Sequence, residues 1–533
     1  LAWVGLSLVP SALLTAFTTH ITTDIASAPL LWVLPLSLYL VTFVVVFRER
    51  MPIPRSLLLA LHLAAVIVAL LQLAQTRHET WFLSSIVGVV VFFTSTLVAH
   101  RTLYKARPAA RHLTEFYLWM SAGGVLGGLF AALIAPKLFS EIFEYPLLVA
   151  LSMACRPGAL GVVRDAAGRL IGPSAREAMW LWVIAAFGAL LVFWLPWLAG
   201  TLQWTFDDWG VAAVLAAVFA AGMLAFWQHP SRQLIFALLI VLAVTSLPSG
   251  VRRGAAERSY FGVYRVSLSD DGQYNVLTHG TTLHGAQRVH DAEGKPVAET
   301  TPGTYYYPAS PMAKSVEAAR AARAEAGEGP GRFGVVGLGA GSLACLSEPG
   351  ESWRFFEIDP VVVGIAAKSG QFTYLVNCQP QMDIVLGDAR LTIAKEEDES
   401  FDLVIVDAFS SDAVPVHLMT AEAIQLYMRK IRKTGVLVLH ISNRYLDLEA
   451  VLGATITKVP DAKGLILSDD EADGSYAQTN STIAVFAYDH DALDPFRALK
   501  GAHDLDGKGL RPWTDDYSDI LGPFRSKLRK KAE

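Results

Sequence analysis

Hydrophobic positions divide the chain near residue 250 into two parts. Before Val251, apolar residues form long runs with few charges, and after it they alternate with polar residues. A helix needs about 20 apolar residues to cross about 30 Å of hydrocarbon. The runs that approach this length are Leu30–Phe47, Ser56–Ala74, Trp81–Val98, Phe116–Ala135, Met179–Ala199, Gly210–Trp227 and Leu234–Leu247, with Leu1–Phe17 as an eighth. This series predicts a transmembrane helical domain of about 8 helices over residues 1–250, because a buried helix of a soluble protein imitates one such run but not a series.

Glycines inside these runs predict close helix packing. The segment "SAGGVLGGLFAAL" contains the pairs Gly123/Gly127 and Gly124/Gly128, whose spacing of four allows another backbone to approach. A few polar residues lie in or beside the apolar runs, and such residues are candidates for transport or lipid access. They are His20, Asp24, His62 and Glu115. Solvation at a helix end explains Asp24 and Glu115 equally well.

The second part has the pattern of a mixed α/β domain. "SYFGVYRVSL", the turn "SDDGQ" and "YNVLTHG" predict a β hairpin within a small β unit over residues 259–310. Strand-like and helix-like segments then alternate over residues 311–533, which predicts a mostly parallel, Rossmann-like sheet covered on both faces. The expected strands are Phe333–Gly337, Trp353–Ile358, Ile384–Leu386, Leu403–Val406, Val436–Ile441 and Thr482–Ala487, with helices including Pro311–Ala326 and Ala421–Arg432.

Glycines and carboxylates follow four successive strands of this expected sheet. "FGVVGLGAGSLACL" places Gly337, Gly339 and Gly341 after the first strand and small residues where a helix is expected to begin. The second, third and fourth strands end in "FFEIDP", "LGDA" and "VDAFSSDAVP", which contain Glu357, Asp388, Asp407 and Asp412. Carboxyl ends of parallel strands share one edge, where α/β sheets bind ligands. We therefore expect a nucleoside-like ligand there, with helix capping as the alternative role of each carboxylate.

Composition and charge narrow the function classes. Hydrophobic residues make up 53% of the chain and charged residues 17%, against about 25% charged in soluble domains. The net charge of −5 argues against a nucleic-acid partner. Cys155, Cys345 and Cys378 lie far apart without metal-ligand spacing, so we expect neither a metal site nor a disulfide framework.

The order of these motifs resembles the spermidine synthase family of polyamine aminopropyltransferases. The resemblance covers roughly residues 259–487, and the whole chain resembles bacterial membrane-fused spermidine-synthase-like proteins, which also share "HISNRYLDL" and "TDDYSD". It implies that Glu357 holds the ribose and that Asp388, with Ala389, holds the adenine of decarboxylated S-adenosylmethionine. It also implies that the glycine loop lies against this donor and that Asp407 is the base and anchor for the attacking amine.

The chain departs from the family at the acceptor side. The family's glycine loop carries an Asp where this chain has Ala340, and its acidic D-E-F-x-Y motif is replaced by "TYYYPASP". Fewer carboxylates weaken the attraction for a dication such as a polyamine. Residues that could rebuild the acceptor pocket are Asp412, Gln287, Tyr306, Tyr307, His284 and Asp516.

The resemblance therefore predicts a membrane-bound transferase that moves an aminopropyl group from decarboxylated S-adenosylmethionine to a small-molecule amine, without a metal. The alternatives are methyl or aminocarboxypropyl transfer from S-adenosylmethionine, and a non-catalytic nucleoside-sensing transporter. The expected location is the inner membrane, with the basic loops Arg48–Arg55 and Arg101–His112 facing the cytoplasm. The synthase-like domain is then cytoplasmic if Tyr145–Cys155 is re-entrant, which we favour because the donor is made in the cytosol, and outside if that segment spans. A homo-oligomer is compatible with the sequence.

Overall fold

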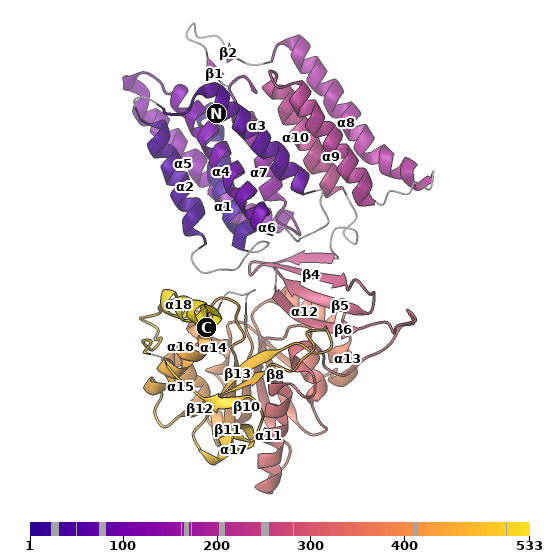
Figure 1. Ribbon diagram of the computed structural model, residues 1–533, viewed down its shortest axis with the longest axis vertical. Coiled ribbons are helices and arrows are strands. Elements are labelled where there is room, and N and C mark those ends of the chain that lie inside the picture. The colour runs from indigo at the N-terminus through magenta and orange to yellow at the C-terminus, as the bar shows by residue number, and fades with distance from the viewer. Residues whose placement is uncertain are drawn as a thin grey trace. The chain divides into compact units, whose positions relative to one another are not determined.

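The computed structural model describes residues 1–22, 31–48, 51–73, 81–160, 163–164, 170–171, 173–201, 208–246, 255–280, 282–409, 414–507 and 509–532. The chain divides into two compact units, Leu1–Val263 and Tyr264–Glu533 (Figure 1). The three-part division expected from the sequence, at residues 250, 259 and 310, remains a prediction about domains.

The first unit is a bundle of apolar helices. They are α1 (Ala2–His20), α2 (Val33–Val46), α3 (Arg55–Gln72), α4 (Trp81–Lys105), α5 (Leu113–Leu129), α6 (Ala135–Leu138), α7 (Glu144–Ser152), α8 (Ala175–Thr201), α9 (Asp208–Ala225) and α10 (Pro230–Thr245), together with the short strands β1 (Val163–Arg164), β2 (Leu170–Ile171) and β3 (Ala255–Arg258). Among the described residues, five segments are long and apolar enough to cross a membrane: Ala2–His20, Arg55–Gln72, Leu83–Lys105, Ala110–Leu138 and Arg176–Leu198.

Helices α1 and α5 pack closely at two glycines. A Cβ at Gly123 would lie 2.4 Å from the carbonyl oxygen of Val4, and one at Gly127 would lie 2.3 Å from that of Leu8. This confirms the Gly123/Gly127 pair as a packing site. By contrast, Gly124 and Gly128 have open space where a Cβ would lie, so the second expected pair makes no such contact.

The second unit contains an eight-stranded sheet with the order β14-β12-β13-β11-β10-β7-β8-β9 (Figure 1). Its strands are β7 (Arg332–Val336), β8 (Ser352–Glu357), β9 (Asp383–Leu386), β10 (Phe401–Val406), β11 (Ile431–His440), β12 (Lys463–Asp469), β13 (Ser481–Ala487) and β14 (Ala502–Asp504). The five strands β11, β10, β7, β8 and β9 form a parallel part of the sheet. Strands β13, β12 and β14 extend it on the β11 side, and each of these pairs is antiparallel. Chain order reverses between β7 and β10, which is the usual ligand position in such sheets.

Alternation along the strands explains why both faces of the sheet are covered. Leu403 and Ile405 of β10 belong to a core that includes α11 (Pro311–Glu325) and α12 (Pro360–Ala367), whereas Val404 and Val406 belong to a core that includes α15 (Ala421–Lys430) and α16 (Leu448–Thr455). A strand completely buried on both faces is typical of a parallel sheet between helices. The remaining helices are α13 (Tyr374–Cys378), α14 (Ala389–Ile393), α17 (Asp494–Arg497) and α18 (Leu521–Ala532).

The expected hairpin is confirmed. Strand β4 (Val263–Leu268) pairs antiparallel with β5 (Tyr274–His279), and β5 pairs with a third strand, β6 (Thr282–Arg288). Strand β6 brings His284 next to the glycine loop, because a Cβ at Gly339 would lie 2.7 Å from the carbonyl oxygen of His284.

The prediction that an α-helix follows the glycine loop is wrong. Residues Ser342–Leu346 form one 3-10 turn, and no α-helix follows before β8, a stretch that is described throughout. Pro349 and Gly350 stop a longer helix at this point. The loop therefore lacks the α-helix N-terminus that the sequence suggested as a source of unpaired N–H groups.

Candidate active site

Four strand ends form one continuous edge that carries the expected donor and catalytic residues. The backbone N–H of Asp407 donates to Val336 O at 2.8 Å, Gly337 N–H to Phe356 O at 2.9 Å, and Gly387 N–H to Glu357 O at 2.9 Å. These hydrogen bonds extend the β10-β7-β8-β9 order one residue past β10, β7 and β9, and to the last residue of β8. Asp407, Gly337, Glu357 and Gly387, which precedes Asp388, consequently follow one another along the carboxyl edge of the sheet.

Asp407 is the most constrained carboxylate of this edge. Its side chain is 7% exposed, and its Oδ1 accepts a hydrogen bond from Nδ1 of His440 at 2.7 Å. Its Oδ2 accepts a short hydrogen bond from the hydroxyl of Tyr306. Burial alone would raise the pKa of the Asp407 carboxyl, but the charge of His440 and the hydrogen bonds from His440 and Tyr306 outweigh burial and hold that pKa below its usual value. Asp407 is therefore ionised at neutral pH.

Tyr306 is a hydrogen-bond donor to this carboxylate at any ordinary pH. Burial raises the pKa of its hydroxyl well above the usual value, and the negative charge of Asp407 adds to the increase. The ring of Tyr305 lies 4.4 Å from that of Tyr306 and 5.0 Å from that of His440, measured between centroids. This aromatic packing fixes both partners of Asp407 in place.

Asp407 opens onto a cavity of about 550 Å³. Its lining combines carboxylates, bases and amides: Thr282, Leu283, His284, Tyr305, Asp407, Phe409, His440, Ser442, Asn443, Arg444, Asp469, Asp470, Thr479, Asn480, Ser481, Thr482 and Lys527. The volume falls in the range of small-molecule sites, which is about 300–1,000 Å³.

His284, which lines this cavity, has one buried polar atom without a described partner. Its Nε2 is buried and has no hydrogen-bond partner among the described residues. Burial, with a smaller effect from the charge of His279, lowers the pKa of His284 to about 4, although the charge of Asp407 opposes the decrease. His284 is therefore neutral at pH 7, and a buried polar atom of this kind is costly unless a ligand or water pairs with it.

The glycine loop lies directly against Asp407. Gly337, Gly339 and Gly341 have φ angles of 98°, 54° and 84°, which favour glycine. A Cβ at Gly337 would lie 2.1 Å from the carbonyl oxygen of Asp407. The carbonyl oxygen cannot move aside easily, because it belongs to the backbone at the edge of the sheet.

Glu357 is buried at the end of β8, with 7% of the residue exposed. Its Oε2 accepts from the N–H of Leu338 and its Oε1 from the N–H of Asp359, both at 2.9 Å. Burial raises the pKa of the Glu357 carboxyl, although these backbone hydrogen bonds oppose the increase. Each oxygen keeps a second lone pair for a hydroxyl donor.

Asp388 is the N-cap of α14, the alternative role that the sequence left open. Its Oδ1 accepts from the N–H of Leu391 at 3.1 Å, and its Oδ2 lies 3.6 Å from Nε2 of His417. Ala389 is buried directly behind it. A third of the Asp388 side chain is exposed, so capping and ligand contact are both sterically open.

The predicted acceptor residues are not gathered in one place. His284 lines the cavity, Tyr306 bonds to Asp407, and the hydroxyl of Tyr307 donates to Asp469 at 2.5 Å. The amide of Gln287 is fully occupied, since it donates to Glu299 O and Thr373 Oγ1 and accepts from Thr373 N.

Two further residues predicted at the acceptor pocket are not among the described residues that line the cavity. Asp516 is exposed in a turn between Thr514 and Tyr517 and is absent from the described cavity lining. Its neighbour Asp515 instead forms an ion pair with Arg390 at 2.6 Å. Asp412 lies outside the described residues.

Sequence reasoning missed the role of His440 and Ser442. The motif "HISNRYLDL" drew attention to this segment, but the contact of His440 with Asp407, and of Ser442 with His440 behind it, depends on β11 lying beside β10. Asp469 and Asp470 were missed with strand β12. A histidine at the end of a buried strand, next to a strand that ends in Asp, was the available signal.

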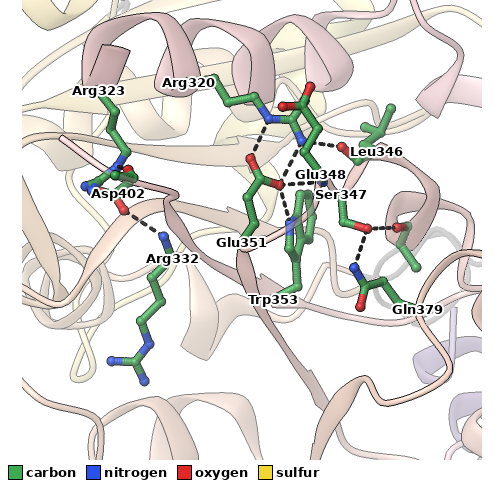
Figure 2. A network of polar contacts seen from close by, with 12 residues as sticks. Arg320, Arg323, Arg332, Leu346, Ser347, Glu348, Glu351, Trp353, Gln379 and Asp402 are labelled. Carbon is green, nitrogen blue, oxygen red and sulfur yellow. Dashed lines mark hydrogen bonds and ion pairs between the residues drawn. The ribbon is translucent and has the colours of Figure 1, made fainter. Parts of the chain in front are cut away.

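The expectation of no disulfide is wrong. Cys345, just after the glycine loop, is bonded to Cys378 at the end of α13, with Cα atoms 5.0 Å apart. The same two segments are joined by Gln379 Nε2, which donates to Ser347 Oγ at 2.8 Å (Figure 2). Sequence spacing did not predict the bond because α13 reaches the loop only through the fold.

A polar network supports the segment that follows the glycine loop. Glu351 accepts two hydrogen bonds from Arg320, at 2.6 and 2.8 Å, and one from Trp353 Nε1 at 2.9 Å (Figure 2). Arg320 also bonds to Leu346 O. The segment is thus anchored to α11 and β8, which keeps the glycine loop in place.

Polar candidates of the helical unit have structural partners. His62 is buried and bonds to Ser152 Oγ at 2.9 Å, and the ring of His20 stacks on Tyr145 at 4.4 Å. Glu115 is exposed near His112. Asp24 lies outside the described residues.

No protein-family model matches the chain. Solved structures that are similar to it include a probable spermidine synthase from Corynebacterium glutamicum ATCC 13032, 14% identical with a TM-score of 0.36, covering 50% of this chain and 98% of that one. Another is spermidine synthase from Thermotoga maritima, 15% identical with a TM-score of 0.33, covering 52% and 87%.

A sequence relative is the polyamine aminopropyltransferase of Vibrio vulnificus (strain CMCP6), 34% identical over 114 residues. The match covers 20% of this chain and 37% of the relative, so the chain spans little more than a third of that protein's length. The strand order of the second unit is that of a Rossmann-like sheet with antiparallel strands at one side. The chain thus contains a spermidine-synthase-like unit of Rossmann type, homologous over 114 residues to a polyamine aminopropyltransferase.

Proposed function

We propose that the protein is a membrane-bound transferase that moves an aminopropyl group from decarboxylated S-adenosylmethionine to a small-molecule amine. The observation that carries this proposal is the ionised Asp407 carboxylate, buried beside the glycine loop at a cavity of about 550 Å³. His284, whose buried Nε2 has no described hydrogen-bond partner, lines the same cavity.

The donor is assigned to the strand ends beside Asp407. Ribose hydroxyls would donate to the free lone pairs of Glu357, and the adenine amino group would donate to Asp388 above Ala389. The glycines bring the backbone close to the ligand, since any side chain at Gly337 would collide with Asp407 O. This arrangement directs the sulfonium towards Asp407.

The transfer needs a neutral amine and a positioned carbon. An amine with a pKa near 10 is mostly protonated at pH 7, so a carboxylate must orient it and accept its hydrogen. In the reaction, the amine nitrogen forms a bond to the carbon next to sulfur. That C–S bond breaks with its electron pair moving to sulfur, which becomes a neutral thioether, and the nitrogen's proton passes to Asp407. The sulfonium is already activated, so the protein supplies alignment and desolvation.

A second candidate is methyl or aminocarboxypropyl transfer from S-adenosylmethionine. Ala340 occupies the position of the family's Asp, is 1% exposed, and packs where Gly285 has no side chain: a Cβ at Gly285 would lie 2.7 Å from the Cβ of Ala340. The loop therefore offers no carboxylate at this position for the ammonium of an aminopropyl group. This observation favours a donor whose ammonium is held elsewhere.

Membrane attachment is proposed from the first unit. Helix α8 exposes large apolar side chains, among them Trp182 at 78%, Phe193 at 63% and Trp197 at 63%. An exposed surface of this kind needs lipid or protein to cover it. The helical segment Glu144–Cys155 has 12 residues, so its length is about 18 Å, which is too short to span the membrane. This length favours a re-entrant segment and therefore a cytoplasmic second unit. The Cys345–Cys378 disulfide favours an oxidising compartment instead. Labelling, from each side of the membrane, of a cysteine introduced at an exposed position of the second unit is therefore the test of sidedness.

Mass spectrometry of the products separates the candidate functions. The purified full chain in detergent is incubated with either sulfonium and a panel of amines. Methylthioadenosine from decarboxylated S-adenosylmethionine supports aminopropyl transfer, and from intact S-adenosylmethionine it supports aminocarboxypropyl transfer. S-Adenosylhomocysteine supports methylation. Tight nucleoside binding without any of these products contradicts the enzyme proposal and favours a sensor.

A further inference from the structure

Asp407, His440 and Ser442 form a hydrogen-bonded chain that continues beyond the reacting carboxylate. Nδ1 of His440 lies 2.7 Å from Asp407 Oδ1, and its Nε2 lies 2.8 Å from Ser442 Oγ. Ser442 Oγ in turn accepts from the backbone N–H of Thr482 at 2.8 Å. Strand β11 supplies His440, and β13 supplies Thr482, so the chain runs across three strands of the sheet.

The donors and acceptors of this chain are constrained at its two ends. An ionised Asp407 can only accept, so Nδ1 of His440 must carry a hydrogen. The backbone N–H of Thr482 can only donate, which leaves the hydroxyl hydrogen of Ser442 free to point at Nε2. Ser442 Oγ can consequently pair with Nε2 of His440 whether or not Nε2 carries a hydrogen, whereas Asp407 requires the hydrogen on Nδ1.

Orientation of the ring is fixed as well. The centroid of Tyr305 lies 5.0 Å from that of His440, and Phe409 packs edge-on at 5.5 Å. His440 is 7% exposed. The imidazole thus cannot rotate freely away from Asp407.

We propose that His440 is a positioning residue for Asp407, and that Ser442 holds the imidazole with its Nδ1 facing that carboxylate. This inference rests on the proposed transfer reaction and deepens it. His440 keeps Asp407 ionised and aimed at the cavity, while Tyr306 holds its second oxygen. The other cavity histidine, His284, does not contact Asp407 through any described hydrogen bond.

Two pairs of variants test this role through a pH profile. His440→Ala removes the Nδ1–H and the charge that lower the pKa of Asp407, so that pKa should rise and the acid limb of kcat/KM should move to higher pH. His440→Asn, whose amide can still donate to Asp407, should recover part of the shift. Ser442→Ala should shift the limb in the same direction by less, and Ser442→Thr, which keeps a hydroxyl, should not. Equal limbs in all four variants would overturn the proposal.

A second measurement needs no turnover, so it separates this inference from the proposed function. Nitrogen NMR of the full chain labelled with ¹⁵N-histidine identifies which nitrogen of His440 carries hydrogen, with His440→Asn providing the assignment. We expect protonation at Nδ1 in the wild type and in Ser442→Ala, because the ionised Asp407 requires that hydrogen in both. Protonation at Nε2 in the wild type would overturn the inference even if the enzyme is active. An inactive wild type with Nδ1 protonated would contradict only the proposed reaction.

Discussion

Replacing Asp407 by Asn tests the proposed chemistry with the smallest change of shape. The carboxylate accepts from His440 at one oxygen and from Tyr306 at the other. In Asn one of these acceptors becomes an NH2 group that faces a donor, so one charge-assisted hydrogen bond, worth about 1.5–3 kcal/mol, is lost. The cost of burying a charge disappears at the same time, and the net change in stability should consequently be small.

The effect on turnover should be much larger than the effect on stability. Loss of a positioned base typically lowers the rate by about 10²–10⁴-fold, which corresponds to about 2.7–5.4 kcal/mol of activation free energy. Nucleoside affinity should change little, because the proposed donor contacts belong to Glu357 and Asp388. The assay is nucleoside product by mass spectrometry beside calorimetric binding of methylthioadenosine.

Asp469→Asn is the matched control. Asp469 lines the same cavity and also accepts a tyrosine hydroxyl, from Tyr307 at 2.5 Å. Its substitution makes the same chemical change at the end of β12 without removing a partner of His440 or Tyr306, so we expect less than about a tenfold loss of rate. An Asp407→Asn variant that retains activity within threefold of the wild type would refute the reasoning, as would equal losses in the two variants.

Three further predictions concern the loop, the ribose contact and the disulfide. Gly337→Ala should destabilise the second unit by about 1–3 kcal/mol, measured as a lower Tm, because Gly337 has a positive φ and its Cβ would clash with Asp407 O. The control Gly364→Ala, which adds a Cβ in open space on α12, should be neutral or stabilising. Because the pKa of Glu357 is raised, the affinity for methylthioadenosine should start to fall, as the pH is lowered, at a higher pH than for an ordinary glutamate. An affinity that stays constant in titration calorimetry from pH 8 to 4.5 would exclude an ionised Glu357 as the ribose acceptor. Cys378→Ser should remove about 3–4 kcal/mol of stability, from the loop of 33 residues that the bond closes, and an unchanged Tm with and without reductant would argue against the disulfide.

The sequence predicted the edge of the sheet because each of its signals is local. Glu357, Asp388 and Asp407 each follow a short apolar strand, and parallel strands bring such positions to one edge. The glycines likewise report a local backbone requirement at Gly337. These features need no knowledge of distant contacts.

Features that depend on contacts between distant segments were not predictable. His440 reaches Asp407 only because β11 pairs with β10, and Cys378 reaches Cys345 only because α13 packs beside the glycine loop. Gln287 was expected at the acceptor, but its amide is satisfied by Thr373, which is 86 positions away in the chain. In each case the partner of a polar group, rather than its own position, decides its role.

A structure of the full chain bound to 5′-methylthioadenosine is the most direct test of the central claim. We predict the ribose hydroxyls on Glu357, the adenine amino group on Asp388, and the sulfur facing Asp407 across the glycine loop. A nucleoside bound elsewhere in the molecule, or one whose sulfur faces away from Asp407, would contradict the account.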